Sequence, residues 1–408
     1  LMLSGGWIIR RGSRQVGSQV QRAWLLVLGS VAASTTIAWA DTTVLVGTAG
    51  TADATLTGGI KSFAVTDGGD TWTQSDFNND DWEQTITAGV TGLTQDIYGN
   101  VYAGANTGDN ATRGIRIYRQ TGGTSVGYLN STWGSGNLTG SAPDGLALGP
   151  NGQLYATIPF GTGNNKLISF DTASLFSGEI QTGQAGTDTN LTGLNTPRGI
   201  TVASDGNFYI ANRGTREILR WTGSGTTATV LDTNNTSGTN YQGVSWDAGN
   251  NQLLTRSNGG QVGSLTLAGT GSDNSINVGG LGLGSTGVAA VEGQVAFTQY
   301  RNPATLTNGT LATAVSGNTA AQTDRASLLG PLYMMVLRDT RLWGGGTGDW
   351  NTGGNWQQGI GGGTGAATFT DGSSATSLPS VLTFTGSAGG TATNNVSGTV
   401  NVGGLNFA

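Results

Sequence analysis

A glycine that opens an apolar strand recurs along most of this chain at nearly constant spacing. The opening glycines stand at 92, 145, 199, 243, 287 and 330, so successive copies lie 53, 54, 44, 44 and 43 residues apart. In the first four copies a turn residue follows seven positions later, and a second strand begins directly after it. The repeated unit is therefore a two-strand hairpin, and a fixed period of this length decides the architecture before local propensity does.

Six units with this spacing predict an all-β fold, a six-bladed β-propeller over residues 41–341. Third strands are expected after the hairpins, at 114–119, 166–170, 217–221 and 263–267. The first blade begins with its second strand, at 41–47, so its first strand has to come from 332–338 at the far end of the domain. That arrangement closes the ring and removes two exposed sheet edges. A glycine-rich solenoid is the alternative, although solenoid repeats are usually about 20 to 30 residues long.

The apolar residues are sufficient for a large core. Hydrophobic residues make up 36% of the chain, 11 residues are tryptophan, and only 7 are proline beside the 72 glycines. Aromatic residues on the second strands recur at the blade period, and we expect them to form the core between blades. They are Tyr102, Tyr155, Tyr209 and Phe297.

Histidine and cysteine are both absent from the chain. Their absence excludes serine–histidine and cysteine–histidine catalysis, thiol redox chemistry and zinc sites built on nitrogen or sulfur. The 18 basic and 24 acidic residues give a net charge of −6. Only two of the basic residues are lysines, and the body of the chain has no basic run, so we expect no nucleic-acid partner.

Residues 1–40 have the order of a secretory signal peptide. Four arginines and no acid precede an apolar stretch at 23–33, and Ala38-Trp39-Ala40 supplies a small-residue cleavage pattern. An uncleaved membrane anchor is the alternative, although the apolar stretch is short for a span of about 20 residues. Cleavage would leave 14 basic and 24 acidic residues, a net charge of −10. We therefore expect a secreted or bacterial cell-surface protein with no transmembrane helix in the mature chain.

The segment 197–221 combines a Pro-Arg-Gly opening, an Asp-Gly turn, a tyrosine-bearing strand and an Ile-Leu-Arg third strand. It resembles an NHL-type propeller repeat, and the copies at 144–170 and 91–119 resemble that repeat more loosely. This resemblance implies the same six-bladed fold. Asn212 stands where the family usually has an aspartate after the second strand, so a role that needs that carboxylate is in doubt.

The last part of the chain, 342–408, has a different pattern. Tryptophans at 343, 350 and 356 are separated by glycine, threonine and asparagine, and short alternating strands follow at 380–385 and 399–407. The segment resembles autotransporter-associated β-strand repeats, which build parallel β-helices on bacterial surfaces. The resemblance implies the start of a β-helical stalk, and we expect further coils and an anchor beyond Ala408.

Residues just before the opening glycines should surround one mouth of the central channel. Together with Asn212, they are the candidate ligand-binding residues, although an ordinary hydrated tunnel would show the same pattern. One acid, one base and several neutral polar groups suit a small molecule or a glycan. The residues before the glycines are Thr91, Asp144, Arg198, Gln242, Thr286 and Leu329.

An enzymatic alternative comes from resemblance to calcium-dependent lactonases, six-bladed propellers that hold the metal in the tunnel with glutamate, asparagine and aspartate. The predicted mouth has only Asp144 as a carboxylate, so a second acid would have to reach the tunnel, from Asp96, Asp247 or Glu292. Streptogramin-lyase-like propellers are a second precedent, but they use a histidine, which this chain lacks.

A separate calcium site is suggested by Asp76, Asn78 and Asp80, which alternate as in the opening of a calcium-binding loop. The glycine and the glutamate of a complete EF-hand loop are replaced by Asp81 and Thr87. A solvated acidic turn is the alternative. Apart from this calcium ion, no cofactor is expected.

Taken together, these features predict a monomeric, non-catalytic binding module on a β-helical stalk. Its expected partner is an extracellular glycan, peptide or matrix component. A metal-dependent hydrolase or lyase of the lactonase-like class is the alternative function, and a structural spacer differs from the binding module only in having no ligand.

Overall fold

The structure is a computed structural model. It describes residues 42–48, 59–78, 89–106, 114–123, 125–130, 143–160, 164–172, 182–184, 186–234, 239–258, 260–277, 286–300, 309–315, 322–328, 331–338, 340–343, 348–349, 356–357, 381–384, 392–393 and 404–407. All of these belong to one compact unit, Trp39–Ala408. Residues 1–40 lie outside the described residues, so the signal peptide stays a prediction.

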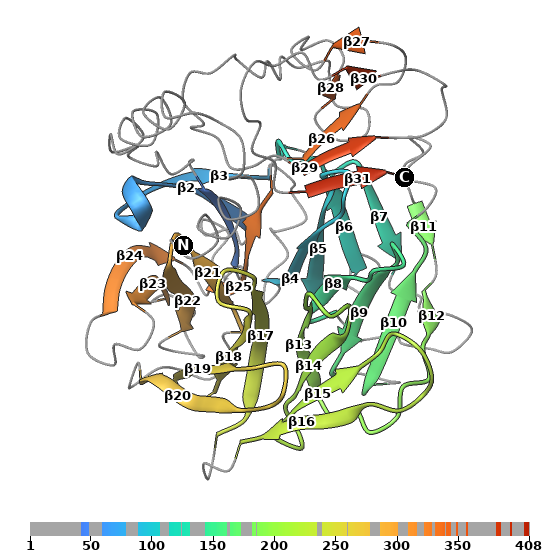
Figure 1. Ribbon diagram of the computed structural model, residues 1–408, viewed down its shortest axis with the longest axis vertical. Coiled ribbons are helices and arrows are strands. Elements are labelled where there is room, and N and C mark those ends of the chain that lie inside the picture. Colours follow the sequence, from blue (N-terminus) through green and yellow to red (C-terminus); the bar gives the residue numbers. More distant parts are fainter. Residues whose placement is uncertain are drawn as a thin grey trace, which may run out of the picture. The chain divides into compact units, whose positions relative to one another are not determined.

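The fold is all-β, and six antiparallel blades are arranged as a propeller (Figure 1). The strands of each blade are given from the channel outwards. Blade 1 contains β25 (Pro331–Leu337), β1 (Thr42–Thr48), β2 (Gly59–Thr66) and β3 (Thr71–Asp76), and blade 2 contains β4 (Gly89–Gln95), β5 (Val101–Asn106), β6 (Gly114–Tyr118) and β7 (Gly127–Asn130). Blade 3 contains β8 (Leu146–Leu148), β9 (Leu154–Ile158), β10 (Lys166–Phe170) and β12 (Thr187–Asp188). Blade 4 contains β13 (Pro197–Val202), β14 (Phe208–Asn212), β15 (Glu217–Trp221) and β16 (Thr229–Thr233). Blade 5 contains β17 (Tyr241–Asp247), β18 (Gln252–Ser257), β19 (Gln261–Leu265) and β20 (Gly271–Asn277). Blade 6 contains β21 (Val288–Val291), β22 (Gln294–Tyr300), β23 (Gly309–Val315) and β24 (Gln322–Leu328). A short 3-10 helix, Asp67–Gly69, joins β2 to β3.

The ring closes as the sequence predicts. Strand β25, from the end of the domain, pairs antiparallel with β1 near its start, with Val44 opposite Val336 and Leu45 opposite Met335. Each first strand contacts the first strand of the next blade, and β21 of blade 6 contacts β25 of blade 1. Strand β1 is therefore not left as an exposed edge and the ring is continuous, which confirms the predicted closure.

Six separate apolar clusters lie between the blades, one at each interface. The four aromatic residues of the second strands, Tyr102, Tyr155, Tyr209 and Phe297, are all buried in these clusters. In blade 3, Tyr155 packs edge-on against Phe208 of blade 4, with ring centroids 4.6 Å apart. The periodic aromatic residues are thus inter-blade core, as expected from their spacing.

One strand was not predicted from the sequence. Strand β11 (Thr182–Gln184) pairs parallel with β7 and adds a fifth strand to the sheet of blade 2. In the last part of the chain, β26 (Thr340–Trp343), β29 (Val381–Phe384) and β31 (Gly404–Phe407) pair in parallel and in succession, with β28 (Trp356–Gln357) antiparallel to β26. A second parallel pair joins β27 (Gly348–Asp349) to β30 (Ala392–Thr393).

No helix long and apolar enough to span a membrane occurs in the part of the chain that the structure describes.

Candidate functional site

The opening glycines lie where neighbouring inner strands approach most closely. A Cβ atom on Gly92 would be 2.5 Å from the carbonyl oxygen of Asp144 in the next blade, and one on Gly199 would be 2.8 Å from the Cα of Gly243. A Cβ on Gly243 would fall well inside contact distance of the Thr286 carbonyl oxygen. At the five opening glycines that the structure describes, 92, 145, 199, 243 and 287, the repeat is therefore a packing requirement, because a side chain there would collide with a neighbouring strand.

Two of the predicted mouth residues use their side chains to join blades. The Thr91 hydroxyl donates to the carbonyl oxygen of Pro143 at 2.5 Å, and the Thr286 hydroxyl donates to that of Leu332 at 3.0 Å. Thr157, on a second strand, bonds the carbonyl oxygen of Arg198 in the same way, at 2.5 Å. These hydroxyl groups link blade 2 to blade 3, blade 3 to blade 4, and blade 6 to blade 1.

Asp144 and Arg198 form an ion pair between blades 3 and 4, with Nη1 and Oδ2 2.9 Å apart. Burial raises the pKa of Asp144, while the positive charges of Arg198 and Arg213 lower it in part. The Arg198 guanidinium lies 4.8 Å from the ring centroid of Phe160, a phenylalanine that is 48% exposed. We call Asp144, Arg198, Arg213 and Phe160 the mouth cluster.

Several buried polar atoms at this end of the propeller have no hydrogen-bond partner. They belong to residues at the start of a first strand or at the end of a second strand, in blades 4 to 6. Because almost all buried polar groups in proteins are satisfied, such a concentration indicates a place that a ligand or water completes. The atoms are Nε of Arg198, Arg213 and Arg256, Oε1 of Gln242, and both amide atoms of Gln299.

The Asn212 side chain is used in hydrogen bonds within its own blade. Its side chain is fully buried, and its Oδ1 accepts a hydrogen bond from the Asn195 backbone at 2.7 Å. Its amide nitrogen donates to the Gly193 carbonyl oxygen at 3.0 Å and to the Thr215 hydroxyl at 2.7 Å. An uncharged amide therefore ties the loops beside β14. Leu329, the sixth residue of the predicted mouth, lies outside the described residues.

The additional carboxylates needed for a tunnel metal are occupied in other ways. Asp96 is buried in the turn after β4, where its two oxygens accept hydrogen bonds from the backbones of Tyr98 and Asn100 and from the side chains of Asn100 and Tyr102. Burial raises the pKa of Asp96 to about 6, and those hydrogen bonds oppose the rise.

Asp247 and Glu292 have comparable roles in their own turns. Asp247 accepts hydrogen bonds from the backbones of Gly249 and Asn250 and from the side chains of Asn250 and Gln252. Glu292 accepts a hydrogen bond from the Thr42 hydroxyl, across the interface between blades 6 and 1. Each carboxylate thus fixes a turn or an interface.

Two of the three predicted calcium ligands lie in different environments. Asp76 is exposed and pairs with Lys61 at 2.5 Å. Asn78 is buried, and its Oδ1 accepts a hydrogen bond from the Ile60 backbone at 2.8 Å. Asp80 lies outside the described residues, so the calcium loop stays a prediction. Within the described ranges, no three acidic side chains are grouped as metal ligands would be.

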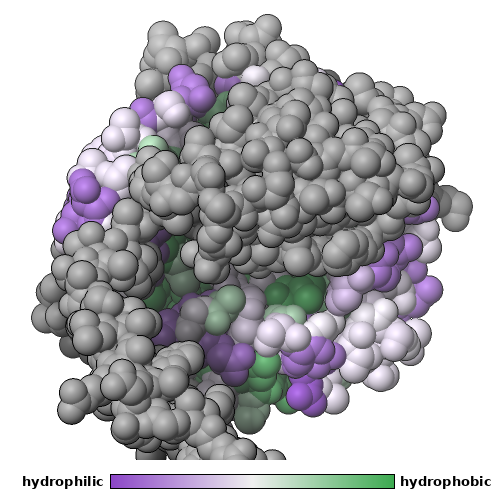
Figure 2. Space-filling view, turned by 45° about the horizontal axis from the view of Figure 1, so that its top comes forward, coloured by the Kyte–Doolittle hydropathy of each residue, from purple (hydrophilic) through white to green (hydrophobic). Residues whose placement is uncertain are grey.

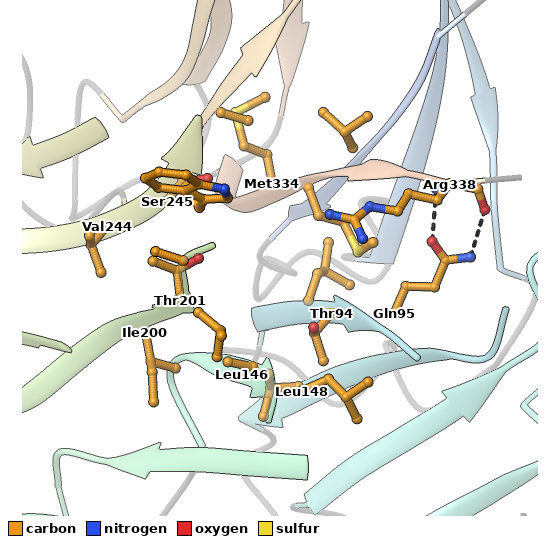
Figure 3. A pocket seen from close by; sticks show the side chains of 18 of the residues that line it. Thr94, Gln95, Leu146, Leu148, Ile200, Thr201, Val244, Ser245, Met334 and Arg338 are labelled. Carbon is orange, nitrogen blue, oxygen red and sulfur yellow. Dashed lines mark hydrogen bonds between the residues drawn. The ribbon is translucent and has the colours of Figure 1, made fainter. Parts of the chain in front are cut away.

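A cavity of about 580 Å³ lies along the first strands, beyond the opening glycines. All six blades contribute to it, mainly with apolar side chains such as Leu146, Ile200 and Met334 (Figure 3). At its rim, Gln95 forms two hydrogen bonds of 2.8 Å with the backbone of Arg338, and Arg338 also lines the cavity. In the space-filling view, hydrophobic residues appear in the recessed part of the described surface, and hydrophilic residues lie beside them (Figure 2).

None of the five predicted mouth residues that the structure describes lines this cavity, because each precedes its opening glycine and the cavity lies beyond the glycines. Its lining was not inferred from the sequence. The signal was present in the segments directly after the glycines, such as Leu93–Ile97 and Val244–Trp246, which the repeat places on the same inner strands.

No family model matches the chain, and no curated protein matches it. Among solved structures, it is similar to a chain of the nidogen–laminin complex, with 18% identity over 72% of this chain and 98% of that chain, and a TM-score of 0.52. It is also similar to a protein of unknown function from Bacteroides caccae, with 13% identity over 73% of this chain and 100% of that chain, and a TM-score of 0.44. Virginiamycin B lyase from Staphylococcus aureus matches with 17% identity over 68% of this chain and 84% of that chain, and a TM-score of 0.41. The first of these similarities, together with the six sheets, identifies the fold as a six-bladed β-propeller.

Proposed function

We propose that this chain is an exported bacterial surface protein whose propeller binds a ligand without transforming it. The mouth cluster is the binding site, and the ligand is an extracellular glycan, peptide or matrix component. The observation that carries this proposal is the Asp144–Arg198 ion pair beside an exposed aromatic ring, that of Phe160. An aromatic face with a donor and an acceptor next to it suits a sugar ring or a peptide side chain.

The charges of the mouth cluster support binding more than acid–base chemistry, although Asp96, with a pKa of about 6, lines the cavity along the first strands. A general acid or base needs a carboxyl group within reach of the substrate, with a pKa suited to proton transfer. Asp144 is paired with Arg198, while Asp96, Asp247 and Glu292 accept hydrogen bonds from their own turns or from a neighbouring blade. Within the mouth cluster, the polar atoms without a hydrogen-bond partner are the Nε donors of Arg198 and Arg213, which bind an acceptor and do not transfer protons at neutral pH.

The parallel pairing in the last part of the chain supports a β-helical stalk. In a β-helix, segments from successive coils stack in parallel, as β26, β29 and β31 do. The residues between these strands are mainly glycine, threonine, serine and asparagine, a composition that suits tight turns. Export follows from the signal peptide predicted at residues 1–40.

Binding by the full chain to a glycan array and to a panel of matrix proteins tests this proposal. Alanine at both Asp144 and Arg198 should abolish capture while the thermal unfolding remains cooperative. The matched control is alanine at both Lys166 and Asp188, an ion pair of 2.6 Å on the outer strands of the same blade. Capture that survives the first double substitution, or that both substitutions weaken equally, would contradict the mouth cluster as the site.

A further inference from the structure

Arg256 is an exception to the blade repeat. The residue on the second strand beside the opening glycine is small in three other blades: Gly104 lies opposite Gly92, and the backbone N–H groups of Thr157 and Thr298 donate to the carbonyl oxygens of Gly145 and Gly287. In blade 5 the residue opposite Gly243 is Arg256. A long cation therefore stands where the ring otherwise has room only for small side chains.

The Arg256 side chain is buried, and no acidic residue that the structure describes forms an ion pair with it. Only 1% of the residue is exposed, and its Nη1 donates to the carbonyl oxygens of Ser257 and Gln261, both at 3.3 Å. Its Nε has no hydrogen-bond partner. Burial lowers the pKa of Arg256 to about 10, and no carboxylate opposes that shift. A buried charge without a counter-ion is strongly unfavourable, so the structure requires something to compensate it.

Gln299 supplies a second set of unused atoms at the same interface. The Arg256 guanidinium lies 6.0 Å from the ring centroid of Phe297, so it faces blade 6. Side chains alternate along a strand, and Gln299, two residues after Phe297 on β22, therefore faces blade 5. Its side chain is fully buried, and neither its oxygen nor its nitrogen has a hydrogen-bond partner.

We propose that a small monovalent anion, a halide or a carboxylate group, binds between blades 5 and 6 on Arg256 and Gln299. The Nε–H group of Arg256 and the amide N–H of Gln299 are the two unused donors that hold it. The anion neutralises the buried guanidinium and joins two blades that contribute no ion pair of their own among the described residues. This site is separate from the mouth cluster and does not depend on the function proposed for that cluster.

Thermal unfolding of the full chain in different sodium salts tests the site. The probe is bromide, with the ionic strength held constant by a bulky sulfonate, and acetate is run in parallel to distinguish a halide site from a carboxylate site. At concentrations about 10 to 100 times the dissociation constant, the bound anion should raise the unfolding temperature by about 3 to 5 °C. Arg256→Gln should remove this dependence, whereas Arg220→Gln, at a half-buried arginine of blade 4, should keep it.

A second variant and a direct observation cover the case in which Arg256→Gln fails to fold. Gln299→Leu keeps the volume and removes the amide, so it should weaken the bromide dependence while Arg256 remains. In crystals grown in bromide, an anomalous peak should lie between Arg256 and Gln299. A water molecule at that position, or an equal salt dependence in wild type and both variants, would overturn the proposal.

Discussion

The tight ring of inner strands predicts that Gly243 cannot be replaced even by alanine. In Gly243→Ala, the new methyl group meets backbone atoms of Thr286, with the carbonyl carbon only 2.8 Å away. Rotation of a side chain cannot relieve this contact, so blade 6 has to move away from blade 5. That movement strains the four hydrogen bonds that the Leu332 carbonyl oxygen accepts, from Thr286 N at 2.9 Å, Thr286 Oγ1 at 3.0 Å, Gly287 N at 2.9 Å and Thr298 Oγ1 at 3.3 Å.

The magnitude follows from these two effects. Overpacking of a rigid site costs about 1 to 3 kcal/mol, and the hydrogen bonds, which are strained but not broken, together cost about 2 kcal/mol. The free energy of unfolding should therefore fall by about 3 to 5 kcal/mol. For a domain of this size the unfolding temperature should fall by about 6 to 10 °C, at roughly 2 °C per kcal/mol.

The matched control is Gly249→Ala in the same blade. Gly249 is exposed, and the nearest atom to its added Cβ is Oδ1 of Asp247, at 3.4 Å. Both substitutions reduce the entropy of the unfolded chain by the same amount, so their difference isolates the contact in the folded state. Urea unfolding of the full chain, followed by tryptophan fluorescence, measures that difference. If the two variants unfold within about 1 kcal/mol of each other, close approach is not the reason for the glycine repeat.

Three further predictions concern Asp96, the buried ion pair and the closing strand. Because the folded pKa of Asp96, about 6, lies above its value of 3.8 in an unfolded chain, this group stabilises the protein in acid, and that contribution is lost as the pH rises through 6. In the wild type, the free energy of unfolding should therefore fall by up to about 3 kcal/mol between pH 4 and pH 7 because of this group. Asp96→Asn should remove that fall, as measured by urea unfolding at each pH. Arg198→Met should lower the free energy of unfolding by about 3 to 5 kcal/mol because it leaves Asp144 buried and unpaired. The double variant Asp144→Asn with Arg198→Met should lose clearly less; if the costs of the two single substitutions add, the two residues are not coupled. A chain ending at residue 330 lacks β25 and should aggregate, whereas one ending at 343 should remain soluble and unfold cooperatively, as judged by size-exclusion chromatography.

The architecture could be predicted from the sequence because each blade repeats the same short-range sequence pattern. An opening glycine, a turn and an aromatic second strand identify the hairpin in each copy, and closure follows from the missing first strand of blade 1. These are short-range signals with a fixed period. The strand at 182–184 carries no such signal, and its parallel pairing with β7 depends on tertiary contacts between blades 2 and 3.

The site was less accessible to sequence reasoning, for two physical reasons. Whether a polar residue faces a ligand or joins two blades depends on hydrogen-bond partners that are distant in sequence, as Thr91 and Thr286 show. Arg256 is conspicuous only after the strand register is known, because the pairing shifts between Tyr241 and Gly243. A register shift of one residue changes which side chains share an interface, and the repeat alone does not reveal it.

Strand β25 connects three properties of this protein that would otherwise be independent. It completes blade 1 by pairing with β1, it lines the cavity with Met334 and Val336, and it ends only two residues before β26 begins the last part of the chain. The pairing runs antiparallel from Thr43 opposite Leu337 to Thr48 opposite Pro331, so release of β25 would break the contact that closes the ring. A ligand in the cavity would contact the same strand and oppose its release. Ring closure, the lining of the cavity and the connection to the last part of the chain therefore depend on the same seven residues.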